Sequence, residues 1–287
     1  MTRHQLLTQL RHQFNAANIF DGASEARDLV LAALHISRSD LIISSDSSVL
    51  EKESAQAISY MNRRLNGEPV DRILGYREFY GRKFYLNADT LSPREDSECV
   101  INLALNMVQE GYHKLRILDL GTGTGCLLLT LLSELPNATG LGVDLSENAV
   151  TMAAKNAQNL KLDARAKFKT SNWFESVHEQ FDLVISNPPY IETAVLPDLE
   201  REVRDHDPVL ALDGGRDGLD CYKIISAHAH KALCKNGHII VEIGMGQANA
   251  VTGLFTNKGF TLESSCMDSA GITRGLAFKS SFFKPCD

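Results

Sequence analysis

Four consecutive residues carry groups suited to holding a planar nitrogen: Asn187, Pro188, Pro189 and Tyr190. Neither proline has an N–H, so the local backbone offers carbonyl acceptors with few competing donors. The side-chain oxygen of Asn187 and the carbonyl of Pro188 can accept both protons of an amide or amino –NH2 group. Tyr190 can stack on that flat group and help to exclude water. The tetrapeptide predicts a site that orients a weak nitrogen nucleophile, with a merely stiff turn as the alternative.

A glycine-rich loop lies upstream, between a predicted strand and a predicted helix: Gly121, Thr122, Gly123, Thr124 and Gly125. Glycines let the backbone pass close to a ligand, and the carboxyl end of a strand is where open α/β sheets bind nucleotides. Asp144 ends the next predicted strand, 23 residues after Gly121. A carboxylate at that place suits the two hydroxyls of a ribose. Asp119 is predicted to order the loop and not to act as a base.

The spacing of this loop narrows the choice of ligand. It is G-x-G-x-G and not the dinucleotide pattern G-x-G-x-x-G, and the lysine of a P-loop is missing. A nucleoside that carries an amino acid, S-adenosylmethionine, therefore fits better than NAD or ATP. For the loop alone, an NAD site and a structural tight turn remain as alternatives. Methyl transfer from a sulfonium to a nitrogen held at Asn187 needs in-line positioning and neither a metal nor a strong base.

The elements that would position these residues follow an α/β pattern from about residue 96. Repeated strand–helix units imply a mostly parallel sheet that is covered on both faces. The last two strands have no helix between them, which predicts an antiparallel hairpin. The strands are predicted near 117–120, 141–144, 166–169, 183–186, 238–243, 260–263 and 276–279, and the helices near 127–135, from Ser146, and at 219–234.

The first part of the chain has a different pattern. Apolar residues recur at helical spacing, and a third helical stretch stops at Gly67. We predict a small helical domain at 1–75, which recognises the substrate. An aromatic hairpin around Gly81 would form a linker at 76–95, and the catalytic domain would span 96–287.

Composition restricts the partners. The net charge is -7, from 29 basic and 36 acidic side chains, so direct nucleic-acid binding is not expected. The six cysteines show no metal-like spacing. No signal peptide and no stretch of about 20 apolar residues is found, so we expect a cytoplasmic protein without a membrane partner.

Taken together, these motifs resemble the class I S-adenosylmethionine-dependent methyltransferases, and among them the release factor glutamine methyltransferases. The resemblance covers nearly the whole chain. It implies an α/β fold with a seven-stranded Rossmann-like sheet, its last strand antiparallel, and a small N-terminal helical domain. It also implies methylation of the glutamine in the Gly-Gly-Gln motif of peptide chain release factors. Further segments that carry it are 67–69, 73–75, 79–81, 93–98, 211–219 and 242–244.

The resemblance also implies roles for single residues. Gly121–Gly125 would line the methionine part of the cofactor and Asp144 would bind its ribose. Trp173 would flank the adenine. Asn187–Tyr190 would hold the glutamine, with Asn187 also beside the cofactor. Three positions depart from the usual pattern: Asn172 stands where Asp is frequent, Ser97 where Thr is frequent, and Asp71-Arg72 replaces a small-aromatic pair.

Three other functions stay open. A sister enzyme could methylate a glutamine of a ribosomal protein by the same chemistry. An adenine methyltransferase acting on DNA or RNA could use the same tetrapeptide, although it must grip phosphates and flip a base. A non-catalytic protein could keep the fold and the cofactor site. Arg94 is predicted either to contact the partner protein or to cap a helix.

Overall fold

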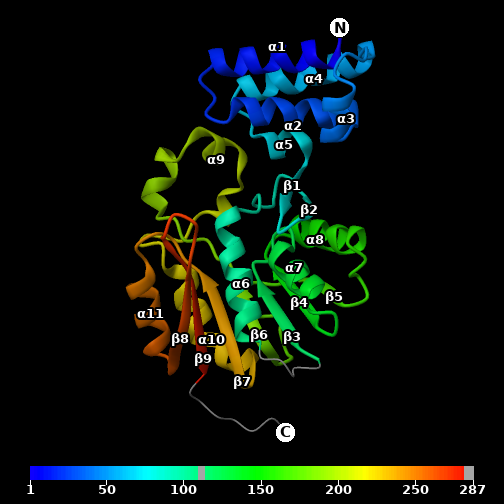
Figure 1. Cartoon of the computed structure of the whole chain (residues 1–287). Helices are drawn as coiled ribbons and strands as arrows, with labels where there is room; N and C mark the ends of the chain where they lie inside the picture. The colour runs from blue at the N-terminus through cyan, green and yellow to red at the C-terminus, as the bar shows by residue number, and fades with distance from the viewer. Residues whose placement is uncertain (109–113, 281–287) are drawn as a thin grey trace. The chain divides into compact units, whose positions relative to one another are not determined.

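The chain folds into two compact units, Met1–Gly75 and Tyr76–Asp287. The computed structural model describes residues 1–108 and 114–280 (Figure 1). Residues 281–287, the end of the predicted domain 96–287, lie outside the described residues. The aromatic hairpin, β1 (Tyr76–Phe79) and β2 (Arg82–Tyr85), belongs to the second unit.

The first unit is entirely helical in its regular structure. Apolar residues at helical spacing build its core, including Leu6, Leu10, Phe14 and Leu29, which are fully buried. Arg64 of the fourth helix donates to the carboxylate of Glu25 in the second helix, at 2.6 Å. The helices are α1 (Arg3–Ala16), α2 (Gly22–Leu34), α3 (Arg38–Ile43), α4 (Glu51–Leu65) and α5 (Val70–Leu74).

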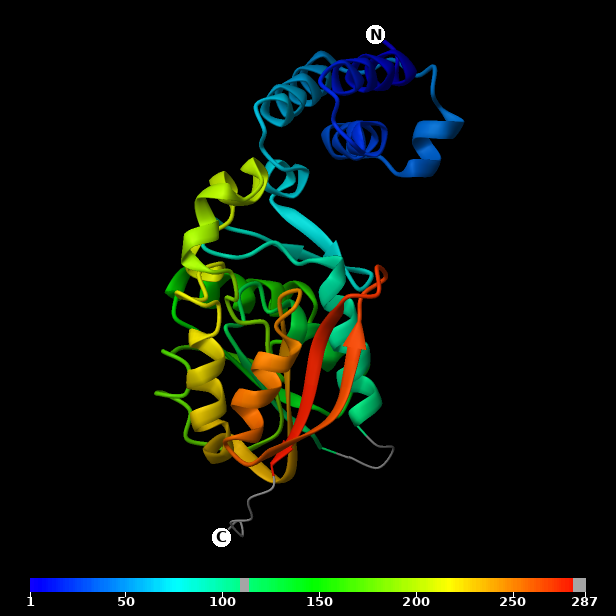
Figure 2. The same ribbon diagram turned by 90° about the vertical axis from the view of Figure 1, so that its left-hand side faces the viewer.

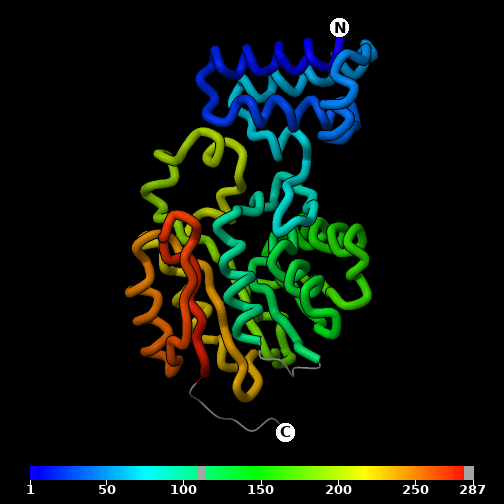
Figure 3. The backbone as a smooth tube through the Cα atoms, viewed as in Figure 1, coloured from blue at the N-terminus to red at the C-terminus, as the bar shows by residue number. Residues whose placement is uncertain are grey.

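The second unit contains a seven-stranded sheet in the order β5-β4-β3-β6-β7-β9-β8. Neighbouring strands from β5 to β7 are parallel, whereas β9 is antiparallel to both β7 and β8. Figure 3 traces the hairpin that β8 and β9 form. This topology confirms the predicted sheet with an antiparallel last strand. The strands are β3 (Arg116–Leu120), β4 (Thr139–Asp144), β5 (Ala166–Thr170), β6 (Phe181–Ser186), β7 (Leu233–Glu242), β8 (Phe260–Met267) and β9 (Thr273–Ser280).

Alternate residues of each central strand face two separate cores. Ile117 packs against α6 (Glu98–Met107), α7 (Cys126–Glu134) and the end of α8 (Glu147–Asn159). Leu118 points to the other face, where α10 (Asp220–Ala232) and α11 (Ala248–Thr256) lie. Figure 2 shows α6 and α10 on opposite sides of the strands. The sheet is thus covered on both faces, as the repeated strand–helix units predicted.

The chain after β6 contains elements that periodicity did not predict. It runs through the 3-10 helix η2 (Thr193–Asp198), the short helix α9 (Arg201–His206) and η3 (Val209–Ala211) before α10 begins. Another 3-10 helix, η1 (Glu95–Ser97), precedes α6. These pieces are too short to show a helical repeat. Within residues 1–108 and 114–280, no helix is both long and apolar enough to cross a membrane.

Candidate active site

A cavity lies at the carboxyl ends of β3, β4 and β6, within the second unit. The parallel strands bring the glycine loop and the tetrapeptide to this one edge. The Ser186 hydroxyl, at the end of β6, donates to the Leu120 carbonyl at the end of β3, at 2.8 Å. Of the residues predicted for the site, the lining includes Gly121, Thr122, Gly123, Thr124, Asp144, Trp173, Asn187 and Pro189. Gly125, Pro188 and Tyr190 are not part of it.

The glycine loop needs glycines for two reasons: its backbone adopts positive φ values, and a side chain would enter the cavity. Gly121 and Gly123 have φ values of +70° and +54°, in the left-handed region. A Cβ added at either position would meet nothing within 4 Å, so each glycine faces open space. Side chains there would therefore both strain the loop and enter the cavity. This bare backbone is a cradle that fits the methionine part of the expected cofactor.

Asp144 fixes the loop as well as facing the cavity. Its Oδ2 accepts a hydrogen bond from the Gly123 N–H and its Oδ1 accepts one from the Ser146 N–H, both at 2.9 Å. Burial raises the pKa of this carboxyl. Each carboxylate oxygen keeps lone pairs for a further donor, so the group could still accept ribose hydroxyls.

Asp119, in β3, orders the same loop through a hydrogen bond with Thr122, as predicted. The Thr122 hydroxyl donates to its Oδ2 at 2.6 Å. The side chain is 1% exposed, and burial raises its pKa to about 7. Its Oδ1 is buried without a hydrogen-bond partner among the described residues. Asp119 does not line the cavity, so its role here is to hold Thr122.

Trp173 lies in the tight segment that follows β5. Its φ is +50°, an unusual value for a bulky residue. The Ser171 hydroxyl holds this conformation by donating to the Trp173 carbonyl at 2.9 Å. The neighbouring Asn172 also lines the cavity, and its amide nitrogen donates to Glu175. Because the amide nitrogen of Asn172 is engaged by Glu175, its amide oxygen is the atom available to accept a hydrogen bond from a ligand.

The charges around the cavity separate the candidate cofactors. The acidic residues in its lining are Asp89, Asp144 and Asp213, and the basic one is Arg94. Arg94 pairs with the buried carboxylate of Asp207, so its charge is already compensated. A pyrophosphate would find few positive partners here, whereas a positively charged sulfonium suits an acidic lining. The residues present therefore fit S-adenosylmethionine better than NAD or ATP.

The tetrapeptide is held by its surroundings. The Asn187 Nδ2 donates to the Ser97 hydroxyl oxygen at 3.5 Å. Pro188 is buried, and Pro189 faces the cavity. Tyr190 instead packs against the core beside Gly244, where a Cβ would lie 3.0 Å from the ring. Burial raises the pKa of Tyr190 to about 12, so its hydroxyl stays protonated.

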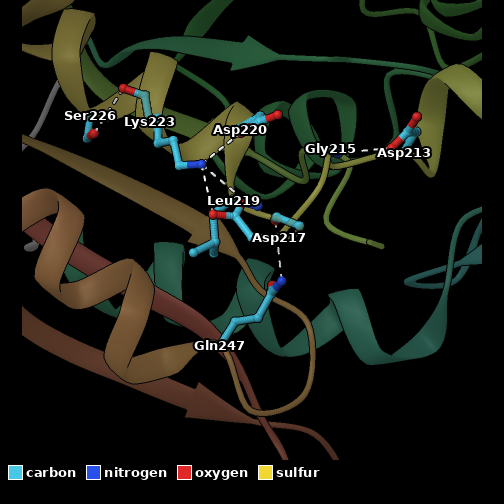
Figure 4. A network of polar contacts seen from close by, with 9 residues as sticks. Asp213, Gly215, Asp217, Leu219, Asp220, Lys223, Ser226 and Gln247 are labelled. Carbon is cyan, nitrogen blue, oxygen red and sulfur yellow. Dashed lines mark hydrogen bonds and ion pairs between the residues drawn. The ribbon is translucent and has the colours of Figure 1, made fainter. Parts of the chain in front are cut away.

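The glycine-rich segment 213–218 braces the end of the tetrapeptide. Gly214 and Gly218 approach the Tyr190 backbone so closely that a Cβ would lie 2.7 Å and 2.4 Å from it. Figure 4 shows Gln247 reaching this segment from the loop before α11. The Gln247 Nε2 donates to the carbonyls of Tyr190 and Gly218, at 3.0 Å and 3.3 Å. Close backbone packing thus explains Gly214 and Gly218 of the 211–219 motif.

Several lining residues carried no predicted role. The segment 89–97 contributes one wall, and Leu145 and Leu210 contribute exposed apolar surface. Leu145 could have been inferred, since it directly follows Asp144. Arg94 occupies the N-cap position of η1, one of its two predicted roles, but its side chain makes no cap hydrogen bond and pairs with Asp207 instead.

Comparison with known proteins identifies the family. Residues 5–75 match the family described as PrmC N-terminal domain, and residues 100–202 match the methyltransferase small domain. A release factor glutamine methyltransferase from Agrobacterium fabrum is 42% identical over 95% of this chain and 96% of its own length. One from Bradyrhizobium diazoefficiens is 41% identical over 96% of this chain and 92% of its own length. The chain belongs to the release factor glutamine methyltransferases.

This membership confirms the family that the motifs indicated. A methyltransferase from Pyrococcus furiosus shares the fold, with a TM-score of 0.52 at 14% identity, over 78% of this chain and 99% of that one. The departure Asp71-Arg72 lies in α5 of the helical unit, and neither residue is part of the cavity lining. Ser97 and Asn172, the other two departures from the release factor glutamine methyltransferase pattern, both line the cavity.

Proposed function

We propose that this protein transfers the methyl group of S-adenosylmethionine to the side-chain amide nitrogen of the glutamine in the Gly-Gly-Gln motif of a peptide chain release factor. One observation carries the proposal. Asn187 and Pro189 line the same cavity as Gly121, Gly123 and Asp144. Residues that would hold an amide therefore line the same cavity as the backbone that would take the cofactor, and the relatives of this chain are glutamine methyltransferases.

The cofactor residues would divide their work. Bare backbone at Gly121 and Gly123 would approach the methionine part, and Asp144 would accept the ribose hydroxyls. Trp173 would flank the adenine ring. S-adenosylmethionine, when bound, supplies an electrophilic methyl group on a positively charged sulfur. The acidic lining favours that charge without a covalent contact.

The tetrapeptide would supply the orientation that an amide nitrogen needs. Its lone pair is delocalised into the carbonyl, so it is a poor nucleophile. Asn187 Oδ1, on a residue of the lining, would accept one of its two N–H protons. The carbonyl of Pro188, a buried residue between the lining residues Asn187 and Pro189, would accept the other, and both would favour the positive charge that develops on nitrogen. One N–C bond forms and one S–C bond breaks with its electron pair staying on sulfur. One N–H proton then passes from the nitrogen to solvent. The partly buried ring of Tyr190 packs against the core and would keep water from the base of the tetrapeptide.

The rim of the cavity suits a protein substrate. Leu145 and Leu210 are more than half exposed, at 54% and 53%, and both line the cavity. Exposed apolar side chains at a cavity mouth are typical of contacts with a partner. We place a loop of the release factor there, and the reaction in the cytoplasm, where translation ends.

The test is methyl transfer from labelled cofactor to purified release factor, followed by peptide mapping. We expect one added methyl group on the Gly-Gly-Gln glutamine. A release factor with that glutamine replaced by asparagine serves as the matched control and should stay unlabelled. Label on ribosomal protein only, or on DNA or RNA only, would replace the proposal by one of those activities. Cofactor binding without label on any of them would indicate a non-catalytic protein.

A further inference from the structure

Three side chains meet behind the tetrapeptide, on the side away from the solvent. Ser186 of β6 pairs in parallel register with Val241 of β7, so the next residues, Asn187 and Glu242, are neighbours. Ser97, the N-cap residue of α6, reaches the same place. Ser97 is 3% exposed and Glu242 is 2% exposed. Ser97 and Glu242 are therefore shielded from bulk solvent, whereas Asn187 is half-buried and lines the cavity.

The hydrogen bonds in this cluster have a defined direction. The Asn187 Nδ2 donates to the Ser97 oxygen at 3.5 Å. The Ser97 hydroxyl and the Asn187 amide both act on the Glu242 carboxylate, and each favours its ionised form by lowering its pKa against the effect of burial. The Tyr222 hydroxyl donates to the Glu242 backbone carbonyl at 2.8 Å, which fixes the strand end. The two groups that face the Asn187 nitrogen are thus fixed by regular structure: Ser97 by the start of α6 and Glu242 by the end of β7.

Direction matters because a side-chain amide has two ends of nearly equal shape. Rotation by half a turn exchanges the nitrogen and oxygen of asparagine at little steric cost. The reaction needs the Asn187 oxygen to face the substrate, because only an acceptor can take a substrate N–H. An ionised carboxylate only accepts, so it selects the nitrogen of Asn187 and leaves the oxygen for the cavity.

We propose that Glu242 and Ser97 are positioning residues that hold Asn187 with its nitrogen turned inward and its oxygen turned toward the substrate. This inference rests on the proposed function, since it assigns the Asn187 oxygen to the glutamine amide. Neither residue needs to touch the substrate. The Oε2 of Glu242 is buried without a hydrogen-bond partner among the described residues, so the carboxylate keeps capacity to accept the inward nitrogen.

The cluster also implies a pH dependence. Burial raises the pKa of Glu242 to about 7. Above that pH the carboxylate accepts from Asn187, whereas below it the protonated group becomes a donor and no longer selects the nitrogen. Activity should therefore rise as the pH rises through about 7. The titratable and charged groups that act on Glu242 or respond to it are Asp96, Cys99, Cys126, Tyr190, Tyr222, Cys266 and Arg274.

A pair of serine variants tests the hydroxyl. Ser97→Ala should lower kcat about tenfold, because one hydrogen bond that orients Asn187 is lost. Ser97→Thr should restore it, because threonine keeps the hydroxyl. The cofactor dissociation constant should stay unchanged in both. Ser226→Ala is the matched control, since Ser226 is 1% exposed and its hydroxyl donates to the Lys223 carbonyl, away from the cluster. Equal kcat for the alanine variant and the wild type would overturn the role of Ser97.

The variant Glu242→Gln tests the carboxylate. Glutamine has the same shape but can donate as well as accept, so it no longer enforces one orientation. We expect the rise of kcat through pH 7 to disappear, with a folded protein in thermal unfolding. A pH profile that keeps the wild-type rise would contradict the proposal. If this variant does not fold, the serine pair still decides.

The side-chain amide protons of Asn187 give a readout that does not need activity. In nuclear magnetic resonance spectra, assigned with Asn187→Asp, we expect their shifts to change as Glu242 titrates, and the change to be lost in Glu242→Gln. If the chemical shifts of these amide protons do not change with pH in the wild type, the positioning role of Glu242 is overturned. An inactive wild type with the expected shifts would contradict only the proposed function.

Discussion

The two halves of the cavity are built in different ways. The cofactor half, which we define as Gly121–Gly125 with Asp144, is held by hydrogen bonds among residues 119–146. The amide half, Asn187–Tyr190, is braced by Ser97, Glu242 and Gln247, which lie far from it in sequence. The cofactor half is therefore held by residues close in sequence, whereas the amide half is held by residues from distant parts of the chain. The two should respond differently to substitution.

Asn187→Ala should show the largest difference between an effect on kcat and an effect on cofactor affinity. It removes the oxygen that accepts from the glutamine amide, so kcat should fall about 100- to 1000-fold. Cofactor affinity should change little, because the glycine loop and Asp144 remain. Single-turnover kinetics and calorimetry measure the two quantities. Turnover near the wild-type value would remove Asn187 from the proposed chemistry.

Asp144→Ala should produce the opposite pattern. It removes the proposed acceptor of the ribose hydroxyls and also releases the N–H groups of Gly123 and Ser146. We expect cofactor binding to weaken by about 1.5–3 kcal/mol, with most of kcat recovered at saturating cofactor. Calorimetry with the wild type as reference checks this. An unaltered dissociation constant would show that Asp144 serves the fold alone.

Gly123→Ala tests the cofactor half again, with a smaller expected effect on cofactor affinity. Its φ of +54° costs an alanine about 1–2 kcal/mol, and the new Cβ enters the cradle. Gly271→Ala is a matched control: its φ is +78°, a Cβ there also meets nothing within 4 Å, and it lies in the β8–β9 turn. Both variants should lose similar stability in denaturant unfolding. Cofactor affinity should fall, about tenfold, for Gly123→Ala alone; equal affinities would show that the cradle is not a ligand contact.

Gln247→Ala should give the smallest effect, and only in the amide half. It removes the hydrogen bonds to the carbonyls of Tyr190 and Gly218 and the one accepted from the Gly244 N–H, at a cost of about 1 kcal/mol for each. A modest loss of kcat should accompany a lower melting temperature, with cofactor affinity unchanged. Loss of cofactor affinity would mean that the two halves are coupled.

The difference between the halves also explains what sequence could predict. The strands, the antiparallel hairpin, the glycine loop and the role of Asp119 follow from local patterns: apolar runs, turn residues and spacing. The short elements between β6 and α10 show no periodicity and were missed. Ser97 and Glu242 belonged to motifs that carried the resemblance, but no local signal placed them beside Asn187. Parallel pairing of β6 with β7 creates that contact, and only the fold contains it.

A crystal structure of the protein with S-adenosylmethionine bound tests the shared cavity most directly. We predict that the methyl carbon points toward the Asn187 side-chain oxygen, with the ribose on Asp144. A methyl carbon directed away from residues 187–190 would contradict the account.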